Sequence, residues 1–61
     1  MMTYRELMKR LGLECNEENL FCVGQWLSED GPRAVQFPDS MAPLDENDTE
    51  WEYKIQRDLG I

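Results

Sequence analysis

The first stretch of hydrophobic positions has the spacing of a helix. Apolar side chains recur at i, i+3, i+4 and i+7, at Tyr4, Leu7, Met8 and Leu11, and this spacing places them on one helix face. Thr3 and Glu6 have the spacing of a capping box. Gly12 follows where a left-handed cap belongs, with Leu13 placed to fold back on Met8. These signals predict a helix over residues 4–11.

The second stretch, LFCVGQWL, covers residues 20–27 and shows no helical spacing. It contains one polar side chain, and its Phe, Val and Trp residues favour a strand. Asp30 and Gly31 form a strong turn signal, in which the glycine would supply a positive φ. RAVQF, residues 33–37, is then the return strand, ended by Pro38. We therefore predict an antiparallel β-hairpin.

Both faces of the predicted strand over residues 20–27 are apolar. Its side chains alternate between one face with Leu20, Cys22 and Trp26 and another with Phe21, Val23 and Leu27. One face must pack on the N-terminal helix. The other meets the C-terminal segment or lies open to a partner.

The remainder of the chain is an acidic loop over residues 38–50, followed by an ambiguous element over residues 51–59. The alternation of Trp51, Tyr53 and Ile55 is typical of a strand, whereas the spacing of Trp51, Ile55 and Leu59 is typical of a helix. Asp48 or Thr49 as a cap and Gly60 as a stop favour the helix. We expect Met41 and Leu44 to pin the loop to the body.

These elements predict one small α+β domain over residues 1–61. An N-terminal helix packs on an antiparallel β-hairpin, with a C-terminal helix or third strand. Between helix and hairpin, Asn16 could cap one short turn. Cys15 and Cys22 lack the spacing of a redox or structural zinc motif, and we expect them to be reduced and half-buried.

Size and charge restrict the function classes. The chain has 61 residues, thirteen acids, six bases, no histidine and a net charge of −7. So small a domain has little material for a pocket with a rigid catalytic shell, so we expect no enzymatic activity and no cofactor. The acidity disfavours direct nucleic-acid binding and binding to anionic membranes. No secretory signal or membrane-spanning run is evident, so we expect a cytoplasmic location.

The stretch PLDENDTEWE is crowded with carboxylates, but it does not have the pattern of a calcium loop. Counted from Asp45, the sixth position holds Glu50 where an EF-hand needs Gly, and the twelfth holds Gln56 where it needs Glu. We expect no metal site. Paired-carboxylate catalysis is also disfavoured, because these acids share one exposed segment and similar environments.

The acidic segment is instead the candidate partner-binding site. Its residues are Asp39, Asp45, Glu46, Asp48, Glu50, Trp51 and Glu52. Carboxylates can take the places of phosphates in a Lys/Arg-rich groove and use the same electrostatic steering. Trp51 would be the apolar anchor, since aromatic residues dominate binding hot spots. The alternative is a solvated acidic loop with Trp51 in the core.

The opening TYRELMKRLG resembles the start of many short phage and bacterial proteins, and the whole chain resembles small acidic phage inhibitors of the anti-CRISPR kind. This resemblance implies a non-enzymatic inhibitor, a monomer or weak dimer. It would bind a protein with a basic nucleic-acid-binding groove, such as a CRISPR surveillance complex, and block its access to DNA. The alternative function is a regulatory or structural adaptor that binds a protein partner through the apolar hairpin.

Overall fold

The computed structural model describes residues 2–45 and 47–61. Within them, every regular element is a helix: α1 (Tyr4–Leu11), α2 (Glu17–Ser28), α3 (Gly31–Gln36) and α4 (Glu50–Leu59). The expected α+β fold with a β-hairpin is therefore wrong. The only strand-like pairing between described residues is an isolated antiparallel bridge of Thr3 with Met41.

Helix α1 is confirmed with the predicted bounds. The Thr3 hydroxyl accepts a hydrogen bond from the backbone N–H of Glu6 at 3.1 Å, and Gly12 takes the left-handed conformation with φ 74°. The Leu13 N–H donates to the Met8 carbonyl at 2.9 Å, the closing bond of a Schellman motif. All four residues of the predicted stripe are buried. The local signals agreed with one another here, and the structure follows them.

Residues 20–27 and 33–37 are helical, so both predicted strands are wrong. Asn16 does not cap one short turn but begins the twelve-residue α2, where its Oδ1 accepts from the Asn19 N–H at 2.8 Å. The apolar run hid the helical spacing because apolar residues stand on both sides of α2. Leu20 and Val23 are buried in the core, whereas Phe21 and Cys22 are exposed on the outer side, where a surface helix ordinarily carries polar residues.

The turn between α2 and α3 also differs from the predicted hairpin loop. Glu29, not Gly31, has the positive φ, at 56°. Gly31 begins α3 with Pro32 in its first turn, a position where the missing proline N–H is harmless. The Gly31 N–H donates to the Gln25 side-chain oxygen at 3.3 Å, which ties the start of α3 back to α2.

The loop after α3 is pinned through its backbone rather than through large side chains. The N–H groups of Tyr4 and Arg5 donate to the carbonyls of Ser40 and Pro38 at 3.1 and 2.9 Å, and Ala42 donates to Met2 at 2.9 Å. Ala42 is buried. Of the two residues expected to pin the loop, Leu44 packs against the core, whereas Met41 is exposed.

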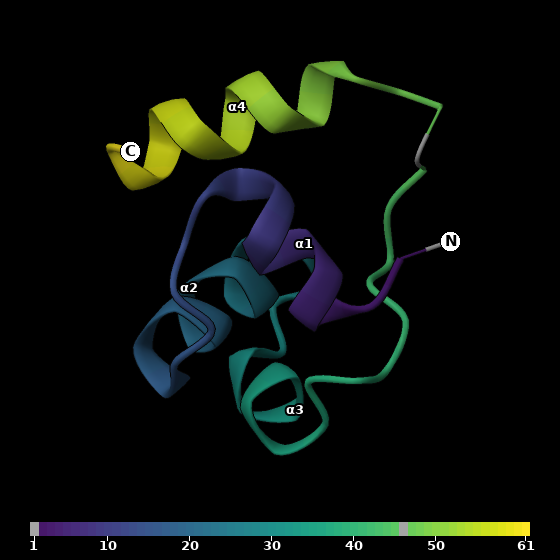
Figure 1. Ribbon diagram of the computed structural model, residues 1–61, viewed down its shortest axis with the longest axis vertical. Helices are drawn as coiled ribbons and strands as arrows, with labels where there is room; N and C mark the ends of the chain where they lie inside the picture. The colour runs from purple at the N-terminus through teal and green to yellow at the C-terminus, as the bar shows by residue number, and fades with distance from the viewer. Residues whose placement is uncertain (1, 46) are drawn as a thin grey trace.

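The prediction that favoured a helix over residues 51–59 is confirmed by α4. Asp48 accepts a hydrogen bond from the Glu50 N–H, and Gly60 ends the helix in the left-handed conformation. In Figure 1, α4 lies across one end of the molecule above α1, while α2 and α3 lie on the other side of α1. No helix of the described residues is long and apolar enough to cross a membrane.

One hydrophobic core joins the four helices and the loop. Its buried members are Met2, Tyr4, Leu7, Met8, Leu11, Leu20, Val23, Ala34, Ala42, Trp51 and Ile55. Helix α1 contributes four of them and lies at the centre of the fold.

Candidate protein-binding surface

The acidic segment follows one margin of the molecule, from the end of α3 to the start of α4 (Figure 1). We call its described carboxylates the acidic edge: Asp39, Asp45, Asp48, Glu50 and Glu52. The predicted site residue Glu46 lies outside the described residues. All members of the acidic edge are exposed except Glu52, which is half-buried.

Two carboxylates of the acidic edge are held in place by the loop backbone. Asp45 accepts a hydrogen bond from the Asn47 N–H at 2.9 Å, and Asp48 accepts one from the Glu50 N–H at 3.0 Å. Each bond spans two residues, as in an Asx-turn. Each carboxylate therefore has a defined direction while most of its oxygen lone pairs still face water.

Three other carboxylates of the edge are paired with the protein's own cations. Arg5 Nε lies 2.8 Å from Asp39, Lys54 Nζ lies 3.7 Å from Glu50, and Arg10 lies 3.6 Å from Glu52. The pKa of the Arg5 guanidinium is raised by its hydrogen bond to Asp39 and by the charge of Asp39. Exposed pairs contribute only about 0–1 kcal/mol each, so an incoming cation can replace such a partner.

Trp51 is a core residue and not an exposed anchor. Its side chain is 7% exposed and belongs to the central hydrophobic cluster. The Arg10 guanidinium lies over the indole ring, 5.3 Å from its centroid, at a distance typical of a cation–π contact. Because Trp51 is buried, it can affect the binding of a partner only by fixing the positions of Glu50 and Glu52.

The exposed aromatic residue of this region is Tyr53, which the sequence reasoning did not select. Its side chain is 75% exposed on α4 and follows Glu50 by three residues, on the same side of the helix. If Trp51 and Ile55 are taken as core positions of one helix, Tyr53 falls on the exposed side of that helix. Tyrosine supplies both an apolar ring and a hydroxyl at interfaces.

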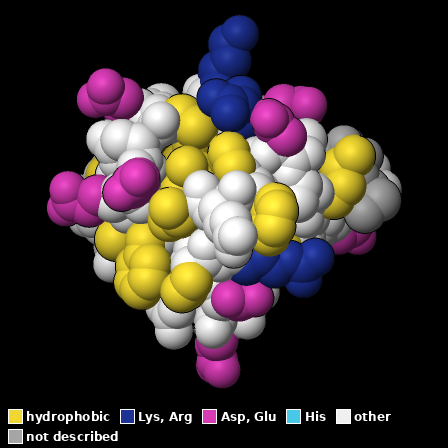
Figure 2. All heavy atoms as spheres, turned by 90° about the horizontal axis from the view of Figure 1, so that it is seen from below, with side chains coloured by type: hydrophobic (Ala, Val, Ile, Leu, Met, Phe, Trp, Pro, Cys, Tyr) yellow, Lys and Arg dark blue, Asp and Glu magenta, His cyan; other side chains and the backbone are white. Residues whose placement is uncertain are grey.

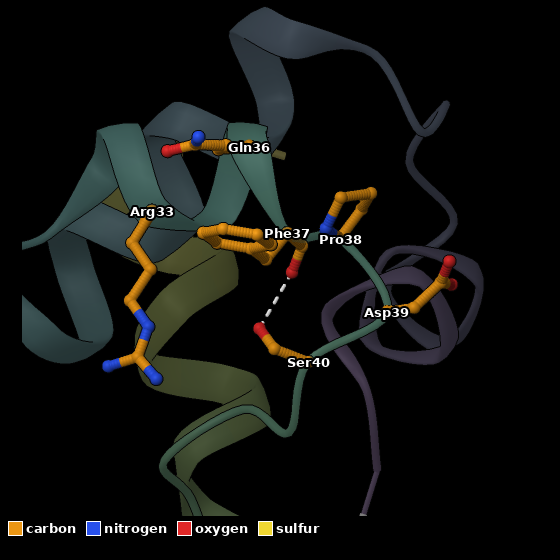
Figure 3. Close-up of a pocket in the computed structure, with 6 residues that line it drawn as sticks. All are labelled: Arg33, Gln36, Phe37, Pro38, Asp39 and Ser40. Carbon is orange, nitrogen blue, oxygen red and sulfur yellow. Dashed lines mark hydrogen bonds between the residues drawn. The ribbon is translucent and has the colours of Figure 1, made fainter.

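A shallow hollow of about 540 Å³ lies beside Asp39, lined by Arg33, Gln36, Phe37, Pro38, Asp39 and Ser40. In Figure 3 the Phe37 ring faces the hollow, whereas the Asp39 carboxylate points away from it. The Ser40 hydroxyl donates to the Phe37 carbonyl at 2.6 Å and shapes the turn. The hollow therefore places no carboxylate of the acidic edge in an enclosed site.

The sequence analysis expected both cysteines to be half-buried, and neither of them is. Cys15 and Cys22 are both free and exposed. Within residues 2–45 and 47–61, no three Cys, Asp or Glu side chains gather closely enough to hold a metal ion.

In comparisons with known proteins, no family model, curated protein or solved structure matches this chain.

Proposed function

We propose that the protein is a non-enzymatic inhibitor that uses its acidic edge to occupy the basic nucleic-acid-binding groove of a partner protein. The partner would be a bacterial complex of the CRISPR surveillance kind, met in the cytoplasm. The observation that carries the proposal is the pair of backbone-held, exposed carboxylates of Asp45 and Asp48. Fixed acceptors lose little conformational entropy when lysine or arginine side chains bind them.

The neighbouring side chains support the same function. Glu50 follows the two aspartates at the start of α4, and Tyr53 adds an exposed ring one turn later. Aromatic residues at the centre of charged surfaces commonly carry binding energy. We assign to Tyr53 the anchoring role that the sequence indicated for Trp51.

The test begins with pull-down from a bacterial lysate and continues with DNA binding by the captured complex. We expect the protein to compete with duplex DNA and to lose this competition steeply as salt rises from low to moderate concentration, because exposed charges are screened. Competition that does not respond to salt would contradict an electrostatic mechanism.

A variant with four neutralised carboxylates tests whether the acidic segment causes the inhibition. Asp45 and Asp48 are changed to Asn, and Glu46 and Glu50 to Gln, so that the side-chain acceptors remain while four negative charges are lost. We expect inhibition to weaken by about tenfold or more, chiefly through slower association. The matched control removes four charges outside both the acidic edge and the α2–α3 surface, by changing Glu6, Glu14 and Glu29 to Gln and Asp30 to Asn. If both variants inhibit equally, net charge and not the acidic edge is responsible.

A further inference from the structure

Residues of the two mispredicted strands, together with Pro32 from the predicted loop between them, form a second surface, whose hollows are lined by no carboxylate of the acidic edge. We call it the apolar face and define it by Phe21, Cys22, Trp26, Pro32 and Val35. Phe21 stands between two open hollows. The first, about 500 Å³, is lined by Glu17, Glu18, Phe21, Pro32, Val35 and Gln36. The second, about 320 Å³, is lined by Phe21, Cys22, Gln25, Trp26 and Leu59.

The apolar face is exposed although the chain has few large hydrophobic residues. The Phe21 side chain is 45% exposed, and Cys22 and Pro32 are exposed beside it. Figure 2 views the molecule from the side of α3 and shows hydrophobic side chains gathered together, bordered by Asp and Glu side chains and, at two places, by Lys or Arg side chains. A contiguous apolar patch with a polar rim is typical of an interaction surface.

The backbone of α2 and α3 preforms this surface. A Cβ on Gly31 would lie 2.7 Å from the Phe21 ring and 2.8 Å from the Phe21 carbonyl oxygen, and one on Gly24 would lie 2.5 Å from the Ala34 Cβ. The two helices therefore touch through glycine, and the Phe21 ring rests on Gly31. Because the Phe21 ring is already held in place, fixing it on binding costs little conformational entropy at the centre of the interface.

The charges at the rim determine which partner fits. Glu17 and Glu18 line the first hollow and are exposed in the first turn of α2. The described lining of the two hollows contains no lysine or arginine. A second copy of the chain, itself of net charge −7, would bring its own Glu17 and Glu18 to this rim, so like-charge repulsion disfavours self-association.

We propose that the apolar face binds an amphipathic helical segment of a partner protein, with two bulky apolar side chains placed on either side of Phe21 and lysine or arginine against Glu17 and Glu18. A helix presents such anchors at i and i+3 or i+4 along one side. This function is separate from that of the acidic edge, because no residue of the acidic edge lines the two hollows.

The experiment measures binding of a Lys/Leu amphipathic helical peptide of about 18 residues, long enough to form several turns. Two matched peptides replace every Lys by Glu or every Leu by Ser. We expect binding of the Lys/Leu peptide alone, because the face needs both the apolar side chains and the positive charges. Equal binding of the Lys/Ser peptide would reduce the interaction to net charge and overturn the proposal.

Three variants of the full chain locate the site. Phe21→Ala should weaken peptide binding by about tenfold or more, as for a central aromatic anchor. Gln36→Lys adds a positive charge at an exposed position of the first hollow and should weaken it by roughly twofold to fivefold without loss of fold. Tyr53→Ala, an aromatic truncation on the other surface, should bind as the wild type does. The proposal fails if Gln36→Lys has no effect or if Tyr53→Ala has the larger effect.

The two cysteines give an independent readout. In the Cys15→Ser variant the remaining thiol is Cys22, which lines the second hollow. In the Cys22→Ser variant it is Cys15, which is exposed and lines neither hollow. The peptide should slow alkylation of Cys22 several-fold and leave that of Cys15 unchanged. Equal protection of both thiols would place the peptide elsewhere. Sedimentation of the unliganded protein as a stable dimer with Cys22 protected would show that a second copy is the occupant, which overturns the proposal.

Discussion

The acidic edge and the apolar face are built by opposite means. In the edge, hydrogen bonds and ion pairs fix polar side chains on a loop and on the first turn of α4, and Trp51 beneath them belongs to the core. In the apolar face, glycine contacts between α2 and α3 fix a phenylalanine ring at the surface. Local polar contacts are individually weak, whereas close packing of helices resists deformation. Substitutions should therefore affect the two regions differently.

The largest expected effect separates Trp51 from Tyr53 within the edge. Trp51→Ala should lower the free energy of unfolding by about 3–5 kcal/mol, because it empties a buried site and removes the ring beneath Arg10. Tyr53→Ala should change it by less than about 0.5 kcal/mol, since the ring is exposed. Chemical denaturation followed by circular dichroism measures both. A stable Trp51→Ala variant that has lost its partner would restore Trp51 as the anchor.

The next effect concerns the contact of α2 with α3. Gly24→Ala and Gly31→Ala should each lower the free energy of unfolding by about 1–3 kcal/mol, because the added methyl group meets Ala34 or the Phe21 backbone. Gln36→Ala, at an exposed position of α3, is the control and should be nearly neutral. Denaturant titration of the three variants decides the point. Tolerance of both glycine substitutions would mean that the apolar face is not rigid.

A smaller effect compares the side-chain acceptors that precede the helices of the two regions. Asn16→Ala removes the N-cap acceptor of α2 and should lower the free energy of unfolding by about 1 kcal/mol. Asp48→Ala removes the Asx-turn acceptor just before α4 and should lower it by about 0.5–1 kcal/mol. Asp48→Asn keeps the acceptor and should lower the free energy of unfolding by only about 0.3 kcal/mol. If Asp48→Asn and Asp48→Ala are equally unstable in thermal unfolding, charge and not hydrogen bonding gives Asp48 its structural role.

The smallest expected effect is a gain in stability at the α2–α3 turn. Glu29 has a positive φ of 56°, which costs a residue with a Cβ roughly 1 kcal/mol relative to glycine. Glu29→Gly should therefore raise the free energy of unfolding by about 0.5 kcal/mol, after the greater entropy of glycine in the unfolded chain is subtracted. Thermal denaturation measures it. A clear loss of stability would show that the Glu29 side chain contributes to the turn.

Helix α1 could be predicted in full, because its cap, its apolar stripe and its glycine stop lie within one short segment. Helix α4 could be favoured over a strand for the same reason. Helix α2 could not: its Phe, Val and Trp residues favour strands in isolation, and its Gly24 weakens a helix. The reason for Gly24 is the approach of Ala34 from α3, which no spacing within residues 20–27 reveals.

The candidate site was predictable to a similar degree. The number and order of the acids follow from the sequence, as does the exposure of Asp39, Asp45 and Asp48 on a loop. Their pairing does not, because Arg5 and Asp39 come together only when the chain start lies beside the loop. Of the two alternatives for Trp51, exposed anchor or core residue, the structure has the second, because, once α4 forms, Trp51 and Ile55 face the core together and Tyr53 faces outward.

The sequence by itself determined both ends of α1, the stop of α4 at Gly60, and a net charge of −7 with six acids and no base between Asp39 and Glu52. Each of these depends on neighbours within a few residues or on composition alone. Tertiary structure decided that residues 20–27 form a helix, which tryptophan is buried, and that Phe21 rests exposed on Gly31. These depend on segments distant in the chain, whose packing outweighs local propensities of a fraction of a kcal/mol per residue.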